Sequence, residues 1–183
     1  MNYIYELNNV ILYIHNTSNQ ISAKRKKNMF QTIIKTDTAK TTLLIRLMVG
    51  AVFLAEGIQK FLYPLKRGVG RFESMGFPAP EFFGNFVGAF EILAGLFILA
   101  GFLTRGGALA TFVIMTVAII TTKIPIAFGV SFGPFVLRSL DTYGFWSMAH
   151  EMRTDWAMWL GSLFLIVRGG GRWSLDRKIS TKQ

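Results

Sequence analysis

A single carboxylate lies in the middle of a run of apolar residues that is long enough to cross a lipid bilayer. The run covers residues 84–105 and carries Glu91 near its centre, and about 20 helical residues span a bilayer. At about 100° per residue, three glycines share the helical face of Glu91, namely Gly84, Gly88 and Gly95. Small residues let a neighbouring helix approach closely. We therefore expect the carboxylate to face another helix and not lipid.

An ionisable side chain at this depth has two explanations. It is costly in hydrocarbon unless it is paired or wetted, and such residues commonly mark functional sites. Glu91 is therefore the first candidate for a catalytic residue that exchanges protons. The alternative is a structural glutamate that hydrogen-bonds across the helices, and the sequence leaves this alternative open.

The composition is that of a membrane protein. Hydrophobic residues make up 51% of the chain and charged residues 16%, whereas about a quarter of a typical soluble domain is charged. The net charge of +10 comes from basic residues gathered before the first apolar run and after the last one. This is the pattern of cytoplasmic termini under the positive-inside rule, and it argues against nucleic-acid binding, which needs a soluble basic face.

The absence of cysteine narrows the chemistry further. It excludes disulfides, thiol redox chemistry and thiolate-bound iron–sulfur clusters in this chain. The chain contains two histidines, one of them in the N-terminal tail, so we expect no dedicated metal site.

The apolar runs predict an all-α membrane protein, an up-down bundle of four transmembrane helices with both termini in the cytoplasm. The first span covers residues 42–63, the second ends near Leu103, and the third covers residues 108–124. The fourth has to begin near Phe145, because its purely apolar part, residues 156–167, is too short to cross alone. We expect this membrane to be the bacterial inner membrane.

The segments around these spans define three regions. We expect a basic, loosely ordered cytoplasmic tail over residues 1–42, a transmembrane domain over residues 43–178 and a short tail over residues 179–183. Because Met29 follows a run of basic residues, we expect the native protein to start there. Residues 125–150 are too polar to span the bilayer and are interpreted as an outer loop or partly re-entrant segment, in the position of a lid.

Several other charged residues lie toward the outer ends of the predicted spans. Glu56 and Lys60 have the (i, i+4) spacing of an ion pair, and Glu56 lies at about the depth of Glu91. On the fourth helix, Glu151 and Asp155 share a polar stripe that should face the bundle. An excess of acids over bases leaves room for a shared proton. We predict that one column of charged residues lines a cavity open to the outer face: Glu91, Glu56 and Lys60 as catalytic residues, with Asp155, Glu151 and His150 binding the substrate.

Two features belong to the cytoplasmic side. Arg46 lies one turn inside the first span, where it either contributes to substrate binding or extends to the lipid headgroups, and the second interpretation is favoured. The glycines at residues 169–171 are typical of a helix end with basic and aromatic anchors at the membrane interface. Their spacing fits neither the P-loop nor the dinucleotide fingerprint.

Three segments of this sequence resemble the DoxX family. They occur in the family's order: residues 44–61 with Arg46, Gly50, Gly57 and Lys60; residues 91–105 with Glu91, Gly95, Gly101 and Arg105; and residues 169–176 with the series Gly-Gly-Gly-Arg-Trp-Ser-Leu-Asp. The resemblance covers residues 43–178 and implies a four-helix protein of the bacterial inner membrane. It also implies a link to thiosulfate:quinone oxidoreductase, or to membrane complexes that handle oxidative or thiol stress.

Two functions of different class fit these residues. The first is the membrane subunit of a quinone-linked oxidoreductase, with a bound quinone in an apolar slot and protons supplied by Glu91, Glu56 and Lys60. Its electrons come from a redox partner subunit, because we expect no intrinsic cofactor. The second is a non-catalytic scaffold or a carrier for a small apolar or weakly acidic molecule, whose charges form an internal ion-pair network. The expected partners are the lipid bilayer, the redox subunit and a second copy of the chain. The sequence does not decide whether the protein is an enzyme.

Overall fold

The protein is a set of helices joined by short connections, as a computed structural model shows. It describes residues 34–181 and, before them, His15, residues 17–21, Lys24 and residues 31–32. In this part of the chain all named elements are helices, which confirms the all-α prediction. The long ones are α2 (Thr42–Leu62), α4 (Pro80–Ala100), α5 (Thr104–Ala118), which continues through a π turn (Ile119–Lys123) into α6 (Ile124–Phe128), and α7 (Phe145–Arg168); the short ones are α3 (Val69–Ser74) and α8 (Leu175–Ser180).

Three of the described helices are long and apolar enough to cross a membrane, namely α2, α4 and the continuous helix Thr104–Phe128. The predicted fourth span is present as α7, whose 24 residues have the necessary length. Its first half carries four ionisable side chains, however, and α7 is not among the three. The transmembrane course of α7 and the orientation of the termini therefore stay predictions.

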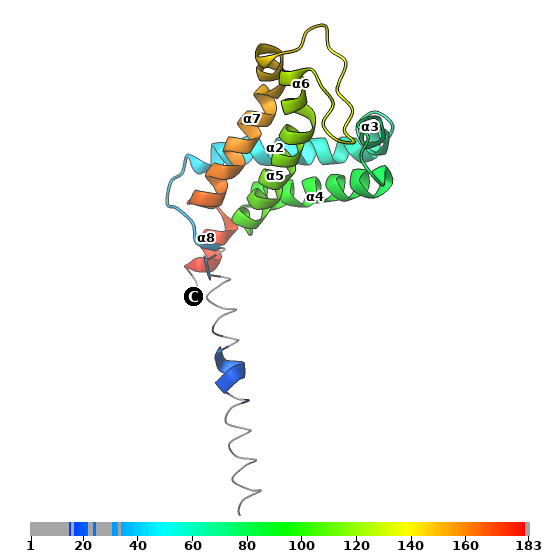
Figure 1. Cartoon of the computed structure of the whole chain (residues 1–183). Coiled ribbons are helices and arrows are strands. Elements are labelled where there is room, and N and C mark those ends of the chain that lie inside the picture. Colours follow the sequence, from blue (N-terminus) through cyan, green and yellow to red (C-terminus); the bar gives the residue numbers. More distant parts are fainter. Residues whose placement is uncertain (1–14, 16, 22–23, 25–30, 33, 182–183) are drawn as a thin grey trace, which may run out of the picture.

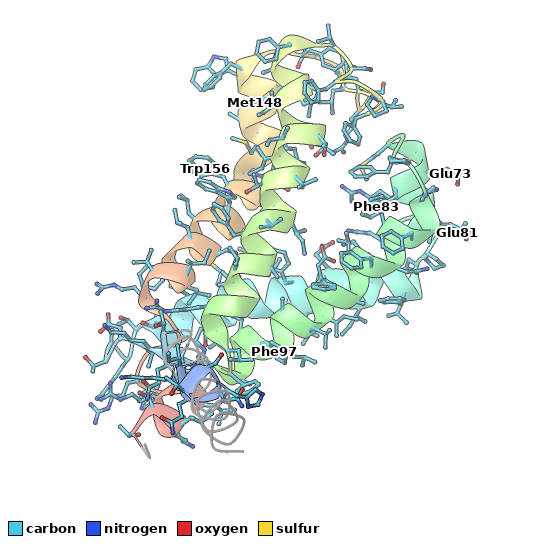
Figure 2. The ribbon with its side chains drawn as sticks, turned by 60° about the horizontal axis from the view of Figure 1, so that its bottom comes forward. Glu73, Glu81, Phe83, Phe97, Met148 and Trp156 are labelled. Atoms are coloured by element: carbon cyan, nitrogen blue, oxygen red, sulfur yellow. The ribbon has the colours of Figure 1, made fainter. Side chains whose placement is uncertain are left out.

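The long helices form two antiparallel pairs and not one closed bundle. Helix α2 packs along α4, and α5 packs along α7. Figure 1 shows the two pairs leaving a shared base beside α8 and diverging from there. We call this end the base and the ends at α3 and α6 the tips. The chain direction alternates from helix to helix as predicted, but the two pairs touch mainly near the base (Figure 2).

Glycines set the close contact between α2 and α4, as the sequence predicts. A β-carbon built on Gly95 would lie 2.7 Å from the backbone nitrogen of Leu54, and one built on Gly57 would lie 2.8 Å from the carbonyl oxygen of Gly88. Nothing larger than glycine fits where the two backbones meet. The face that carries Glu91 therefore lies against α2.

The third long helix contains a π turn. Pro125 has no backbone N–H and cannot bond to the carbonyl four residues earlier. The helix adapts just before it, where the Ile124 N–H donates to the Ile119 carbonyl, five residues back. Such insertions change which side chains face inward and are frequent at functional sites. Here Lys123, at the end of the π turn, is buried with 9% of its surface exposed.

The segment predicted to be a loop, residues 125–150, is irregular only over residues 129–144, because helices extend into both of its ends. The irregular part reaches from one tip to the other. The Val136 N–H donates to the Met75 carbonyl at 3.0 Å, and the ring centroids of Phe135 and Phe77 lie 4.7 Å apart. Figure 2 shows Phe83 of α4 pointing toward this junction. The loop therefore joins the tips of the two helix pairs.

The chain before α2 lies against the chain after α7 at the base. The Asp37 N–H donates to the Arg168 carbonyl at 2.9 Å, and the side chains of the same two residues form an ion pair. Gly169 ends α7 with a φ of 76°, which confirms the predicted glycine helix stop. The expected start at Met29 lies outside the described residues.

Candidate functional site

Lys60 of α2 and Glu91 of α4 form an ion pair between the two helices. The Lys60 Nζ donates to the Glu91 Oε2 at 2.5 Å, and the two side chains are only 12% and 4% exposed. The close glycine contacts between α2 and α4 bring these helices near enough for the pair to form. Of the three predicted catalytic residues, the structure therefore brings two together.

Glu56, the third, is not part of this contact. Its carboxylate lies 3.9 Å from the Arg67 guanidinium, and its side chain is 40% exposed. The predicted Glu56–Lys60 pair is wrong, because Lys60 pairs with the buried carboxylate instead. A buried charge without a partner costs far more free energy than a half-exposed one.

A second buried pair lies between the π turn and α7. The Lys123 Nζ is 3.3 Å from the Asp155 Oδ2, and these side chains are 11% and 20% exposed. The sequence pattern places Asp155 on the correct face of α7, whereas Lys123 lies within the predicted third span, residues 108–124, and was not among the candidate site residues. The signal for it was a lysine two residues before a proline inside an apolar run, because a proline there can force the turn that buries the lysine.

Glu151 and His150 lie at the tip of α7 and apart from both buried pairs. The Glu151 Oε2 accepts from Arg138 of the loop at 2.5 Å, and His150 is exposed. Both line an open depression of about 380 Å³ beside the loop. The predicted single column of charged residues is therefore wrong. Its members form separate pairs because they stand on two helix pairs that diverge.

Arg46 is buried at the base and does not extend to lipid headgroups. It is 2% exposed, and its guanidinium donates to four backbone carbonyls. The acceptors are Ile98 at 2.8 Å, Leu99 at 2.5 Å, Gly170 at 3.1 Å and Trp173 at 2.6 Å. These bonds provide hydrogen-bond donors for carbonyl groups at the end of α4 and in the segment that follows α7. The interpretation that favoured the headgroups is wrong, and the geometry gives Arg46 a structural role at this position and no free face for a substrate.

Asp176 of α8 complements Arg46 and was missed by the sequence analysis. It is 1% exposed, and its carboxylate accepts from the N–H groups of Leu103 and Thr104 at 2.7 and 2.9 Å and from the Thr104 hydroxyl at 2.8 Å. It thereby caps the N-terminus of α5, where a carboxylate is favourable. Arg46 and Asp176 together hold the α4–α5 turn at the base.

The buried pairs define what the molecule can do chemically. An ammonium and a carboxylate in contact can hold and exchange a proton, provided that a ligand reaches them. Within the described part of the chain, no group of three or more metal-ligating side chains comes together. The candidate functional site is therefore Lys60 with Glu91, and Lys123 with Asp155 is a second candidate.

Comparison with known proteins places this architecture in a family. The DoxX family model matches residues 41–124, a stretch that contains Arg46, Lys60, Glu91 and Lys123. The chain is 47% identical over 142 residues to an uncharacterized membrane protein of Mycobacterium tuberculosis, covering 78% of this chain and 83% of that protein. No solved structure matches the chain. On these matches, and on the helical fold that accompanies them, this chain belongs to the DoxX family of integral membrane proteins.

Proposed function

We propose that this protein is the membrane subunit of a quinone-linked oxidoreductase module, in which Lys60 and Glu91 exchange protons with a bound quinone. The observation that carries the proposal is the Lys60–Glu91 pair, which is hydrogen-bonded at 2.5 Å between two helices that are long and apolar enough to cross a membrane. A lysine and a glutamate are costly to keep there, and residues kept at such cost are commonly functional.

Lys60 and Glu91 can supply the proton transfer that reduction of a quinone requires. A quinone, when bound, takes up two electrons and two protons on reduction. One proton would pass to a carbonyl oxygen from the Lys60–Glu91 pair, in which the Lys60 ammonium donates to the Glu91 Oε2, and the second proton would come from water. The electrons come from a partner subunit, because this cysteine-free chain cannot hold a thiolate-bound redox centre.

The apolar part of such a site is supported by aromatic residues on α4. Phe82, Phe86 and Phe90 form a row of rings with centroid spacings of 5.4 and 4.5 Å, and their exposed fractions are 60%, 45% and 43%. The row ends one residue before Glu91, on the neighbouring face of the helix. A flat ring and an isoprenoid tail both favour such a surface.

We further propose that the membrane is the bacterial inner membrane and that the base faces the cytoplasm. The basic residues around the base support this orientation, since cytoplasmic segments are enriched in lysine and arginine. A bacterial relative of this family supports the compartment.

The test is the quinone content of protein purified from its own membrane in lipid nanodiscs. We expect bound quinone, measured by mass spectrometry after extraction, and a loss of about tenfold or more in Glu91→Gln. Glu81→Gln is the matched control, because Glu81 lies in the first turn of the same helix and points away from the helix pairs (Figure 2). Wild-type protein that carries no quinone and no redox partner would refute the proposal.

A second candidate is a scaffold or carrier without turnover. The observation that favours it is that Glu56, Glu91, Glu151 and Asp155 each have a cationic partner, so the charges of the spans are internally balanced. Under this function Glu91→Gln would fail to assemble, whereas under the first it would fold and lose only its ligand. Size-exclusion chromatography of the variant separates the two.

A further inference from the structure

The two helix pairs carry the same arrangement of charges. In each pair, a lysine near the tip of the first helix meets a carboxylate on the second. Lys60 and Glu91 are separated by 31 residues, and Lys123 and Asp155 by nearly the same interval. The second arrangement has no role in the function proposed above.

The two pairs differ in how fully their hydrogen-bonding groups are used. Lys60 donates to Glu91 at 2.5 Å, whereas the Lys123 Nζ is 3.3 Å from Asp155 and makes no hydrogen bond to any described residue. An ammonium has three donors, and buried donors are almost always satisfied. Lys123 is therefore a largely buried cation whose three N–H groups are not used in hydrogen bonds to the described residues.

The neighbouring hydroxyl groups do not use this capacity. Thr121 and Thr122 donate to carbonyls one turn back in their own helix, at 2.8 and 2.6 Å. Thr116 does the same and accepts from the Trp159 indole N–H at 2.9 Å. No described hydroxyl donates to Asp155. The pair therefore offers a free N–H donor and a carboxylate oxygen between the π turn and α7.

Flat aromatic rings border this pair. Trp159 lies one turn after Asp155 on α7, and its ring stacks between Phe112 and Trp156, with centroid distances of 4.9 and 5.3 Å. Figure 2 shows Trp156 projecting from α7 on the side away from the α2–α4 pair. In a membrane, this side of the molecule faces lipid. A lipid-soluble molecule reaches it without passing through water.

We propose that Lys123 and Asp155 form a second binding site, for a planar, lipid-soluble carbonyl compound of the quinone class that enters from the bilayer. The Lys123 ammonium donates to a ring carbonyl oxygen, Asp155 keeps the ammonium in place, and the exposed Trp156 stacks on the ring. The identity of the ligand rests on the proposed function, whereas the location of the site rests on the unused donor and the aromatic stack.

The test is a titration of the purified protein in nanodiscs with decylubiquinone, followed by quenching of tryptophan fluorescence. We expect Lys123→Met to raise the dissociation constant by about tenfold or more and Lys66→Met, on an exposed lysine, to leave it unchanged. Trp156→Leu should remove most of the quenching, and Trp173→Leu at the base should not.

A double variant keeps the test independent of folding. Lys123→Met leaves Asp155 buried without a partner, so Lys123→Met with Asp155→Leu removes both charges and should fold but bind weakly. Wild-type affinity in the double variant would overturn this inference. If the double variant has wild-type affinity but Glu91→Gln binds weakly in the same titration, only this second site is refuted and the proposed function stands. Weak binding by the double variant with normal binding by Glu91→Gln would support this site and refute the role of Lys60 and Glu91. A wild-type protein that binds no decylubiquinone would overturn both.

Discussion

Replacing Arg46 by methionine tests whether the base is held together by its guanidinium. Methionine keeps a long apolar side chain but removes every donor. The four carbonyls that accept from Arg46 belong to the end of α4 and to the segment after α7. The variant should therefore loosen the base, including the bonds from α2 to the end of α4, while leaving the glycine contacts between these two helices in place.

The loss of stability in Arg46→Met is estimated from the hydrogen bond that each of the four carbonyls loses. Ile98 keeps a second donor, the Gly101 N–H, so its loss is small. The Gly170 carbonyl is buried and is left without a partner in the described part of the chain, which costs about 1–3 kcal/mol. The bonds to Leu99 and Trp173 are only partly buried, and each contributes about 1 kcal/mol. The total is about 3–5 kcal/mol, or a fall in melting temperature on the order of 10 °C.

The assay is thermal unfolding in mild detergent, followed by circular dichroism. Arg105→Met is the matched control, since Arg105 lies at the same base and donates one bond, to the Val167 carbonyl at 3.0 Å. Its loss should not exceed about 1.5 kcal/mol. Equal melting temperatures for the two variants would refute the reasoning and would restore the view of Arg46 as a residue that interacts with headgroups.

Two further variants test the packing and the cap. Gly95→Ala should destabilise the protein by about 1–3 kcal/mol because its β-carbon meets the backbone of α2. Gly106→Ala has open space around the new atom and should be neutral or slightly stabilising; similar thermal unfolding of the two would contradict the close α2–α4 contact. Asp176→Asn should cost about 1–3 kcal/mol and lower the hydrogen-exchange protection of the Leu103 and Thr104 amides, and unchanged protection would show that another group caps α5.

Local sequence patterns were sufficient to predict where the helices lie and which of their faces are buried. The glycine face of α4 is buried as predicted, and the face of α7 that carries Asp155 is partly buried there and fully buried two turns later, at Ser162. A helical face depends only on the periodicity of its own residues. For that reason the small residues and the carboxylate of α4 could be assigned to one side without knowledge of the neighbouring helices.

Contacts between residues that are distant in sequence could not be predicted from such local patterns. The sequence placed the α4–α5 turn at residues 104–107, whereas α5 begins at Thr104, because Asp176 caps it from another part of the chain. The partners of Lys60 and Lys123 likewise depend on which helices pair, and on a π turn that rotates one lysine inward.

The amino-acid sequence by itself therefore determined the helices, their buried faces and the presence of ionisable residues among apolar ones, since each of these follows from local periodicity and composition. The tertiary structure decided which charges meet, because an ion pair between helices forms only where the packing of two backbones brings its members together. Glu56 and Lys60 are neighbours along α2, yet Lys60 pairs with Glu91, which is buried and would lie without a counterion if Lys60 turned away.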